Sequence, residues 1–90
     1  MRNFEVQLFD TTRINSEPTY KIALSASDSR SQGQAMKDYS SEEVFTNDLK
    51  KRLRCTNRFI EGFFSNPKTN NVLQGCPLND EDAAYFGWHQ

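Results

Sequence analysis

The chain has 90 residues, a formal net charge of −1 at pH 7 and a hydrophobic fraction of 36%. A chain of this length forms one domain, so we expect a single small domain over residues 1–90. The near-neutral charge argues against a dedicated nucleic-acid-binding protein, because such proteins are usually basic overall.

The two cysteines and the one histidine argue against a structural zinc site, which needs about four such ligands at short spacings. We therefore expect no metal and no cofactor. No stretch is long and apolar enough to span a membrane, and the first residues, MRNFEVQLFD, lack the apolar run of a signal peptide. These observations predict a cytoplasmic protein in which both cysteines are reduced.

Two strands are predicted in the first part of the chain, over residues 3–10 and 19–26. Apolar residues alternate along both, which is the pattern of a half-buried strand. The set expected to face the core is Phe4, Val6, Leu8, Tyr20, Ile22, Leu24 and Ala26. The segment between the strands, TTRINSEP, is rich in turn formers, so the strands are expected to form an antiparallel hairpin. Because a lone hairpin is marginally stable, its apolar face needs a cover.

Residues 27–38, SDSRSQGQAMKD, are polar and rich in serine. We predict a flexible connector here, with a short, weak helix as the alternative. The segment holds a single glycine and no GK[ST] sequence follows it, so a phosphate-binding loop is not indicated.

Residues 40–65 carry the strongest pattern in the chain. Ser40 and Glu43 have the spacing of a capping box, and Pro67 predicts that a helix ends near Ser65. At 100° per residue, apolar positions cluster on one side. These positions are Phe45, Leu49, Leu53, Thr56, Ile60, Phe63 and Phe64, with Phe59 at the edge. The sequence therefore predicts one long amphipathic helix that covers the hairpin.

The same segment carries a basic face formed by Lys50, Lys51, Arg54 and Arg58. Three of these lie at i, i+4 and i+8, a spacing at which like charges slightly destabilise a helix. Basic residues late in a helix also complement its dipole, so a solvated face is one interpretation. The other is a surface for an anion or an acidic partner.

Residues 72–76 are expected to form a short third strand, stopped by Gly75 and Pro77. Asn79 or Asp80 can then cap a small C-terminal helix. The tail ends in the aromatic residues Tyr85, Phe86 and Trp88. They fit either the last piece of the core or an exposed patch that binds a partner, since aromatic side chains dominate interface hot spots.

No catalytic arrangement is evident. The one histidine, His89, is the penultimate residue, a position that frays in most domains, and the dinucleotide and P-loop motifs are missing. The predicted fold class is α+β: an antiparallel hairpin, with a short third strand as an option, packed on one long helix, followed by a small helix. Such an architecture is common among small regulators and inhibitors of phages and mobile elements, a fold-level analogy.

We therefore expect a non-enzymatic protein-binding module that regulates or inhibits a larger protein. The partner would contact Tyr85, Phe86 and Trp88, or the basic face. The alternative is a nucleic-acid-binding protein that uses Lys50, Lys51, Arg54 and Arg58 on phosphates. A homodimer is a further option, because a small core favours association.

Overall fold

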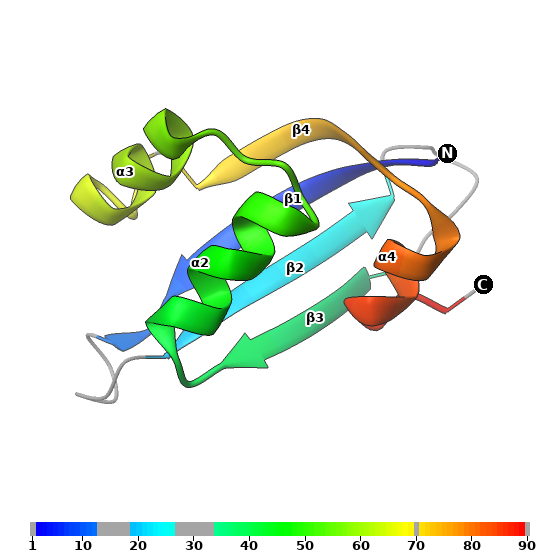
Figure 1. Ribbon diagram of the computed structural model, residues 1–90, viewed down its shortest axis with the longest axis horizontal. Helices are drawn as coiled ribbons and strands as arrows, with labels where there is room; N and C mark the ends of the chain where they lie inside the picture. Colours follow the sequence, from blue (N-terminus) through cyan, green and yellow to red (C-terminus); the bar gives the residue numbers. More distant parts are fainter. Residues whose placement is uncertain (1, 13–18, 27–33, 70, 90) are drawn as a thin grey trace.

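The described residues form one four-stranded antiparallel sheet with the strand order β3-β2-β1-β4 (Figure 1). The computed structural model describes residues 2–12, 19–26, 34–69 and 71–89. Its strands are β1 (Arg2–Asp10), β2 (Tyr20–Ala26), β3 (Gln34–Tyr39) and β4 (Val72–Leu78). The α+β class is thus confirmed.

The predicted hairpin is confirmed. β1 and β2 pair with Phe4 opposite Ala26 and Asp10 opposite Tyr20. Alternation sends every second side chain of each strand to the same face. Six side chains of β1 and β2 on that face are buried: Phe4, Val6, Leu8, Tyr20, Ile22 and Leu24. Ala26, also predicted to face the core, is partly buried against them.

The predicted connector over residues 27–38 is wrong for residues 34–38, which belong to strand β3; residues 27–33 lie outside the described part. β3 pairs with β2, and its Ala35 and Tyr39 are buried on the core face. Lys37 occupies the core-facing position between them, with its ammonium 4.8 Å from the ring centroid of Tyr85. A lysine at this position interrupts the apolar alternation, which explains why the sequence pattern gave no strand.

The single long helix over residues 40–65 is also wrong. The segment forms two helices, α2 (Glu42–Lys51) and α3 (Asn57–Ser65). The N-cap of α2 is Ser41 rather than Ser40, and its hydroxyl accepts a hydrogen bond from the backbone N–H of Val44. A straight helix over these residues would be about 39 Å long, whereas the longest extent of the molecule is 37 Å. Breaking the helix keeps both halves on the sheet.

Two local features make this break. Arg54 adopts a left-handed conformation with φ 57°, which lets the N–H of Cys55 donate to the carbonyl of Leu49 at 2.9 Å. The hydroxyl of Thr56 then accepts from the N–H of Phe59 at 3.1 Å and so caps α3. Glycine is the usual left-handed residue at a helix end. Because an arginine occupies this position, the sequence pattern does not predict the break.

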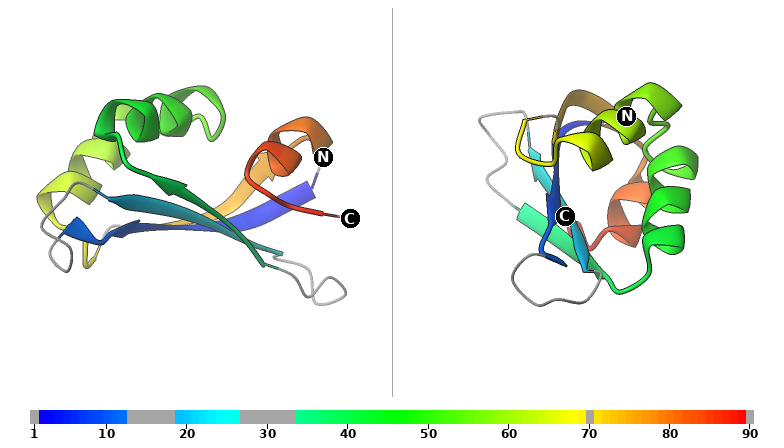
Figure 2. Two further views of the ribbon diagram at one scale, coloured as in Figure 1. Left: turned by 90° about the horizontal axis from the view of Figure 1, so that it is seen from below. Right: turned by 90° about the vertical axis from the view of Figure 1, so that its left-hand side faces the viewer.

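All helices of the described part lie on one face of the sheet (Figure 2). They include the predicted C-terminal helix, α4 (Asp80–Tyr85), whose N-cap is Asn79. The core lies between these helices and the sheet. On the opposite face, Met36 is 53% exposed and Val72 is 39% exposed. None of the described helices is long and apolar enough to cross a bilayer.

The predicted third strand is present as β4, but it is not stopped by Gly75 and Pro77, which both lie inside it. β4 also contains a bulge. Phe4 of β1 lies opposite Cys76, but Val6 lies opposite Leu73, so β4 holds one extra residue. Gly75 has φ 67° at this point, the conformation of the glycine in a G1 bulge. The bulge reverses the alternation of β4. As a result, Leu73 and Cys76 both face the helices.

Candidate functional site: a pocket between the interhelical linker and β4

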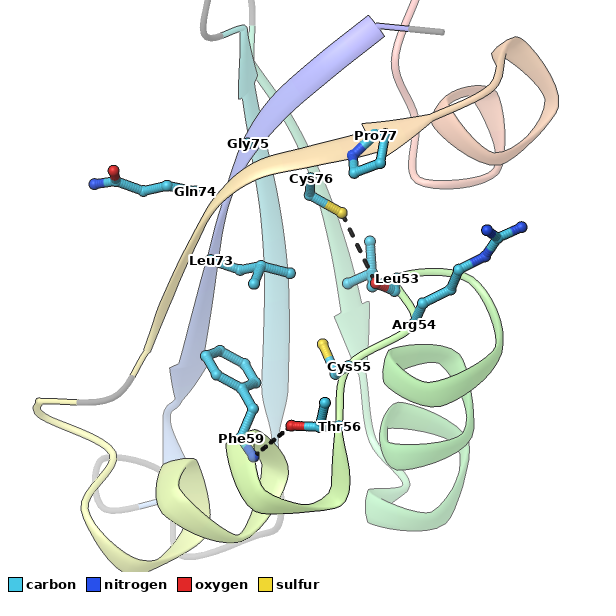
Figure 3. Close-up of a pocket in the computed structure, with 10 residues that line it drawn as sticks. All are labelled: Leu53, Arg54, Cys55, Thr56, Phe59, Leu73, Gln74, Gly75, Cys76 and Pro77. Atoms are coloured by element: carbon cyan, nitrogen blue, oxygen red, sulfur yellow. Dashed lines mark hydrogen bonds between the residues drawn. The ribbon is translucent and has the colours of Figure 1, made fainter.

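A pocket of about 390 Å³ lies between strand β4, the start of α3 and residues 53–56 (Figure 3). Residues 53–56 form the linker between α2 and α3. The volume of this pocket falls in the range of pockets that hold small ligands or side chains of a partner, about 300–1,000 Å³. The pocket is mainly apolar. Its apolar lining consists of Leu53, Cys55, Phe59, Leu73, Cys76 and Pro77.

Each wall of the pocket depends on an irregularity of the backbone. On the linker side, the left-handed Arg54 turns the chain out of α2 and brings Cys55 to the pocket. On the strand side, the bulge at Gly75 turns Leu73 toward the helices, while Gln74 points away from the pocket (Figure 3). Non-glycine residues with positive φ and β-bulges both concentrate near functional sites. Here one of each borders the same cavity.

Both cysteines of the chain line this pocket, as free thiols. Burial raises the pKa of Cys55 to about 12, and Cys76 adds to this effect. Burial also raises the pKa of Cys76, whose thiol lies 3.9 Å from the carbonyl oxygen of Leu53. The reactive form of cysteine is the thiolate. Both side chains are therefore neutral at physiological pH, and they serve as apolar lining.

The linker side of the pocket carries the charge of the lining. Among the described residues that line the pocket, Arg54 is the one that carries a charge, and none is a carboxylate. Its side chain is exposed and extends away from the thiols, outside the pocket (Figure 3). On the strand side, the exposed lining residues Gln74, Gly75 and Pro77 are uncharged.

The predicted basic face does not form a single row. Lys50 and Lys51 lie in the last turn of α2, Arg54 lies in the linker and Arg58 lies in α3. The i, i+4, i+8 spacing aligns these residues only on a continuous helix, and the chain is not helical between α2 and α3. All four side chains are exposed, and within the described residues none of them forms an ion pair. They therefore lie on three consecutive segments of the chain, the end of α2, the linker and the start of α3, and of the four it is Arg54 that lines the pocket.

The C-terminal aromatic residues do not form the predicted exposed patch. Phe86 is 1% exposed and Trp88 is 7% exposed, and the Trp88 ring packs edge-on against Phe4 with centroids 4.9 Å apart. A partner could contact these two rings only if the core opened. Tyr85 is half-buried, so the interpretation of the tail as a piece of the core holds for this group.

Tyr85 belongs to a polar cluster centred on Asp48 of α2, which is 8% exposed. One oxygen of Asp48, Oδ2, accepts hydrogen bonds from the hydroxyl of Tyr39 at 2.5 Å and from that of Tyr85 at 2.7 Å. The Arg52 guanidinium stacks on the Tyr85 ring at 3.6 Å and pairs with Asp82 of α4 at 2.9 Å. This cluster joins β3, α2 and α4. Because its members satisfy one another, we assign it a structural role.

A search of the described residues finds no group of three or more His, Cys, Asp or Glu side chains that could hold a metal ion. Comparisons with protein-family models, with curated proteins and with solved structures give no match for this chain. The pocket itself was not found by sequence reasoning. The one available signal was Gly75 within the β4 sequence, since a glycine inside a strand often marks a bulge.

Proposed function

We propose that this protein is a non-enzymatic protein-binding module that regulates or inhibits a larger protein, and that it holds an apolar side chain of that partner in the pocket between the linker and β4. The observation that supports this proposal most directly is the apolar pocket of about 390 Å³ with its two neutral thiols. Interfaces often depend on one anchor side chain buried in such a pocket. The raised pKa of both thiols argues against nucleophilic chemistry there.

Two neighbouring residues of β4 provide a matched test. Leu73 faces the pocket, whereas Val72 faces the uncovered side of the sheet and is 39% exposed. The tagged wild type, Leu73→Lys and Val72→Lys would each be used to capture partners from an extract of the native cell, with and without nuclease treatment and at two salt concentrations. We expect Leu73→Lys to weaken the captured complex at least tenfold, the effect of losing about 1.4 kcal/mol or more at an anchor. Val72→Lys should bind like the wild type.

The outcomes separate the possible contact surfaces. Loss of the partner with Val72→Lys instead would place the contact on the uncovered face of the sheet. Equal capture by all three proteins would contradict the role of the pocket. Thermal unfolding of each variant would show that the comparison is made between folded proteins.

The second candidate function is nucleic-acid binding through the basic residues Lys50, Lys51, Arg54 and Arg58, which are all exposed. Binding of this kind falls steeply with salt, because counterions are released at each phosphate contact. Recovery of nucleic acid alone, lost at the higher salt concentration and after replacement of Lys50, Arg54 and Arg58 by Glu, would favour it. Capture that survives the triple replacement would exclude it.

A further inference from the structure

The conformation of Arg54 is unfavourable for its residue type. Left-handed backbone is unfavourable for a residue with a β-carbon, and glycine is the common choice at a helix end. Glycine at position 54 would allow the same turn without this penalty, yet the chain has an arginine with φ 57°. Strained residues of this kind concentrate where they contribute to binding. A binding role of the Arg54 side chain would account for an arginine at this strained position.

The electrostatic surroundings indicate what Arg54 can recognise. The residues that flank the linker, Lys50, Lys51 and Arg58, are also basic and exposed. The first turn of α3, which follows the linker, contains no acidic residue. The strand side of the pocket is uncharged. Arg52 at the C-cap of α2 is already paired with Asp82 of α4, so Arg54 and these three neighbours are the basic residues here that form no ion pair among the described residues. This positive rim beside an apolar cavity is complementary to a ligand that is apolar at one point and negative at the next.

The position of the Arg54 guanidinium indicates where a negative charge of the bound segment would lie. Arg54 lines the pocket, but its side chain extends outside it (Figure 3). An acid buried inside the pocket would be out of reach and would lose its hydration among Leu53, Phe59 and Leu73. An acid on the residue next to the anchor would remain at the rim, within reach of the guanidinium.

We propose that the pocket and Arg54 together recognise a protein segment in which a large apolar side chain is adjacent to Asp or Glu. This inference rests on the proposed function, because it names the kind of segment that the pocket binds. The apolar side chain fills the cavity, and the carboxylate pairs with Arg54 at its mouth. Lys50, Lys51 and Arg58 add a longer-range attraction for acidic sequence, which salt screens.

A phage-displayed library of random linear peptides tests the segment directly. The library would be selected against the wild type, against Arg54→Glu and against Lys68→Glu. The last variant is the control, because Lys68 is exposed, does not line the pocket and follows α3, at the far end of a helix about 13 Å long. We expect the wild type and Lys68→Glu to enrich an apolar residue beside Asp or Glu. Arg54→Glu should enrich an apolar residue beside Lys or Arg, since reversing one charge reverses the preference at that position.

Affinities for a synthetic peptide from the wild-type selection give the size of the effect. Arg54→Gly should bind it about threefold to fivefold more weakly, the contribution of an exposed ion pair near 1 kcal/mol. Replacing the acid of the peptide with its amide should weaken binding to the wild type by at least the same factor. The same replacement should have a much smaller effect on binding to Arg54→Gly, where only the longer-range attraction of Lys50, Lys51 and Arg58 remains.

The result that would overturn this inference differs from the one that would overturn the proposed function. Enrichment of an apolar residue without an adjacent acid, unchanged in Arg54→Glu, would refute the role of Arg54 but leave the pocket as an anchor site. Failure of the wild type to enrich any apolar motif, together with capture of the cellular partner by Leu73→Lys as strong as by the wild type, would refute the binding function of the pocket itself. Preferential selection of acidic peptides without an apolar residue would show that the charge alone binds.

Discussion

Replacement of Arg54 by glycine should stabilise the protein, although the same replacement destabilises an ordinary helix. Arg54 has φ 57°, and left-handed backbone costs a residue with a β-carbon about 1–2 kcal/mol. Glycine removes that strain but loses more backbone entropy on folding, which costs about 0.5–1 kcal/mol. The net expectation is a free energy of unfolding higher by roughly 0.5–1 kcal/mol. For a domain of this size, the melting temperature should rise by about 2–8 °C.

The sign of this change tests the break between α2 and α3. In a continuous helix over residues 40–65, glycine at position 54 would lower stability by about 1 kcal/mol. Urea denaturation followed by far-UV circular dichroism would give the free energy of unfolding of the wild type, Arg54→Gly, Arg54→Ala and Arg58→Gly. Arg54→Ala retains the β-carbon and should show no comparable gain. Arg58 is the second residue of α3, so Arg58→Gly should lose stability by at most about 1 kcal/mol, the penalty of glycine in a helix interior.

A clear loss of stability in Arg54→Gly, similar to that in Arg58→Gly, would refute the reasoning. It would mean that residue 54 is helical in solution, that the linker does not exist, and that the pocket between the linker and β4 does not form. The proposal for Arg54 would fail with it, because that proposal depends on the left-handed turn at the rim.

Four other perturbations follow from the same contacts. Gly75→Ala should destabilise the fold by about 1 kcal/mol through backbone strain, as urea denaturation would measure. The reason is the φ of 67°, since no atom of the described residues other than the chain neighbours lies within 4 Å of the added methyl group. Asp48→Asn should lower the free energy of unfolding by about 1.5–3 kcal/mol, since a buried carboxylate that accepts from two tyrosine hydroxyls is replaced by a neutral amide. Trp88→Ala should destabilise the domain by about 3–5 kcal/mol, as expected for a buried aromatic ring, with a large fall in melting temperature. Cys55 has a pKa raised to about 12, so its thiol should react with iodoacetamide at pH 8 far more slowly in the folded protein than in urea.

Each of these expectations has a contrary result. A stable Gly75→Ala variant would show that β4 has no bulge at this position. An Asp48→Asn variant as stable as the wild type would mean that the polar cluster does not join the three elements. If Trp88→Ala has the melting temperature of the wild type, the tail is exposed, and the hypothesis that its aromatic residues bind a partner is favoured again. Alkylation of Cys55 at the rate of a free thiol would show that its side chain is not buried as the structure places it.

The pH dependence of stability follows from the tyrosines around Asp48. Burial, followed by the hydrogen bond to Asp48, raises the pKa of Tyr39 above its usual value of 10.0. The hydrogen bond to Asp48 and burial do the same for Tyr85. A raised pKa means that the folded state holds its proton more tightly than the unfolded chain does. The stabilisation is therefore complete below pH 10 and is lost progressively as the pH rises above it. Tyr39→Phe should reduce this alkaline loss.

Much of the fold could be predicted because its signals are local. Alternation along β1 and β2 identified the core-facing residues from Phe4 to Leu24, and the capping residue Asn79 located the start of α4. The apolar positions of residues 40–65 were mostly correct as well: Phe45, Leu49, Ile60 and Phe63 are buried. They keep helical spacing because both helices pack on the same face of one sheet.

The candidate site could not be predicted in the same way. Its walls depend on a left-handed arginine, a bulge in β4 and a threonine that caps a second helix. None of these departs from the sequence pattern of a continuous helix or a short strand strongly enough to be recognised. Strand β3 could not be predicted for a similar reason. Its core-facing Lys37 contacts the rings of Tyr39 and Tyr85, and Tyr85 is far away in sequence.

The sequence by itself determined the α+β class, the hairpin, the C-terminal helix and most of the buried residues, because periodicity and capping involve neighbours in the chain. Only the tertiary structure decided where the long helical segment breaks, which tail residues are buried and where a pocket opens. The physical reason is the sheet. Its limited length favours two short helices over one long one, and its β4 strand lies beside the resulting linker. These distant segments meet only in the folded chain, so no local pattern records their contact.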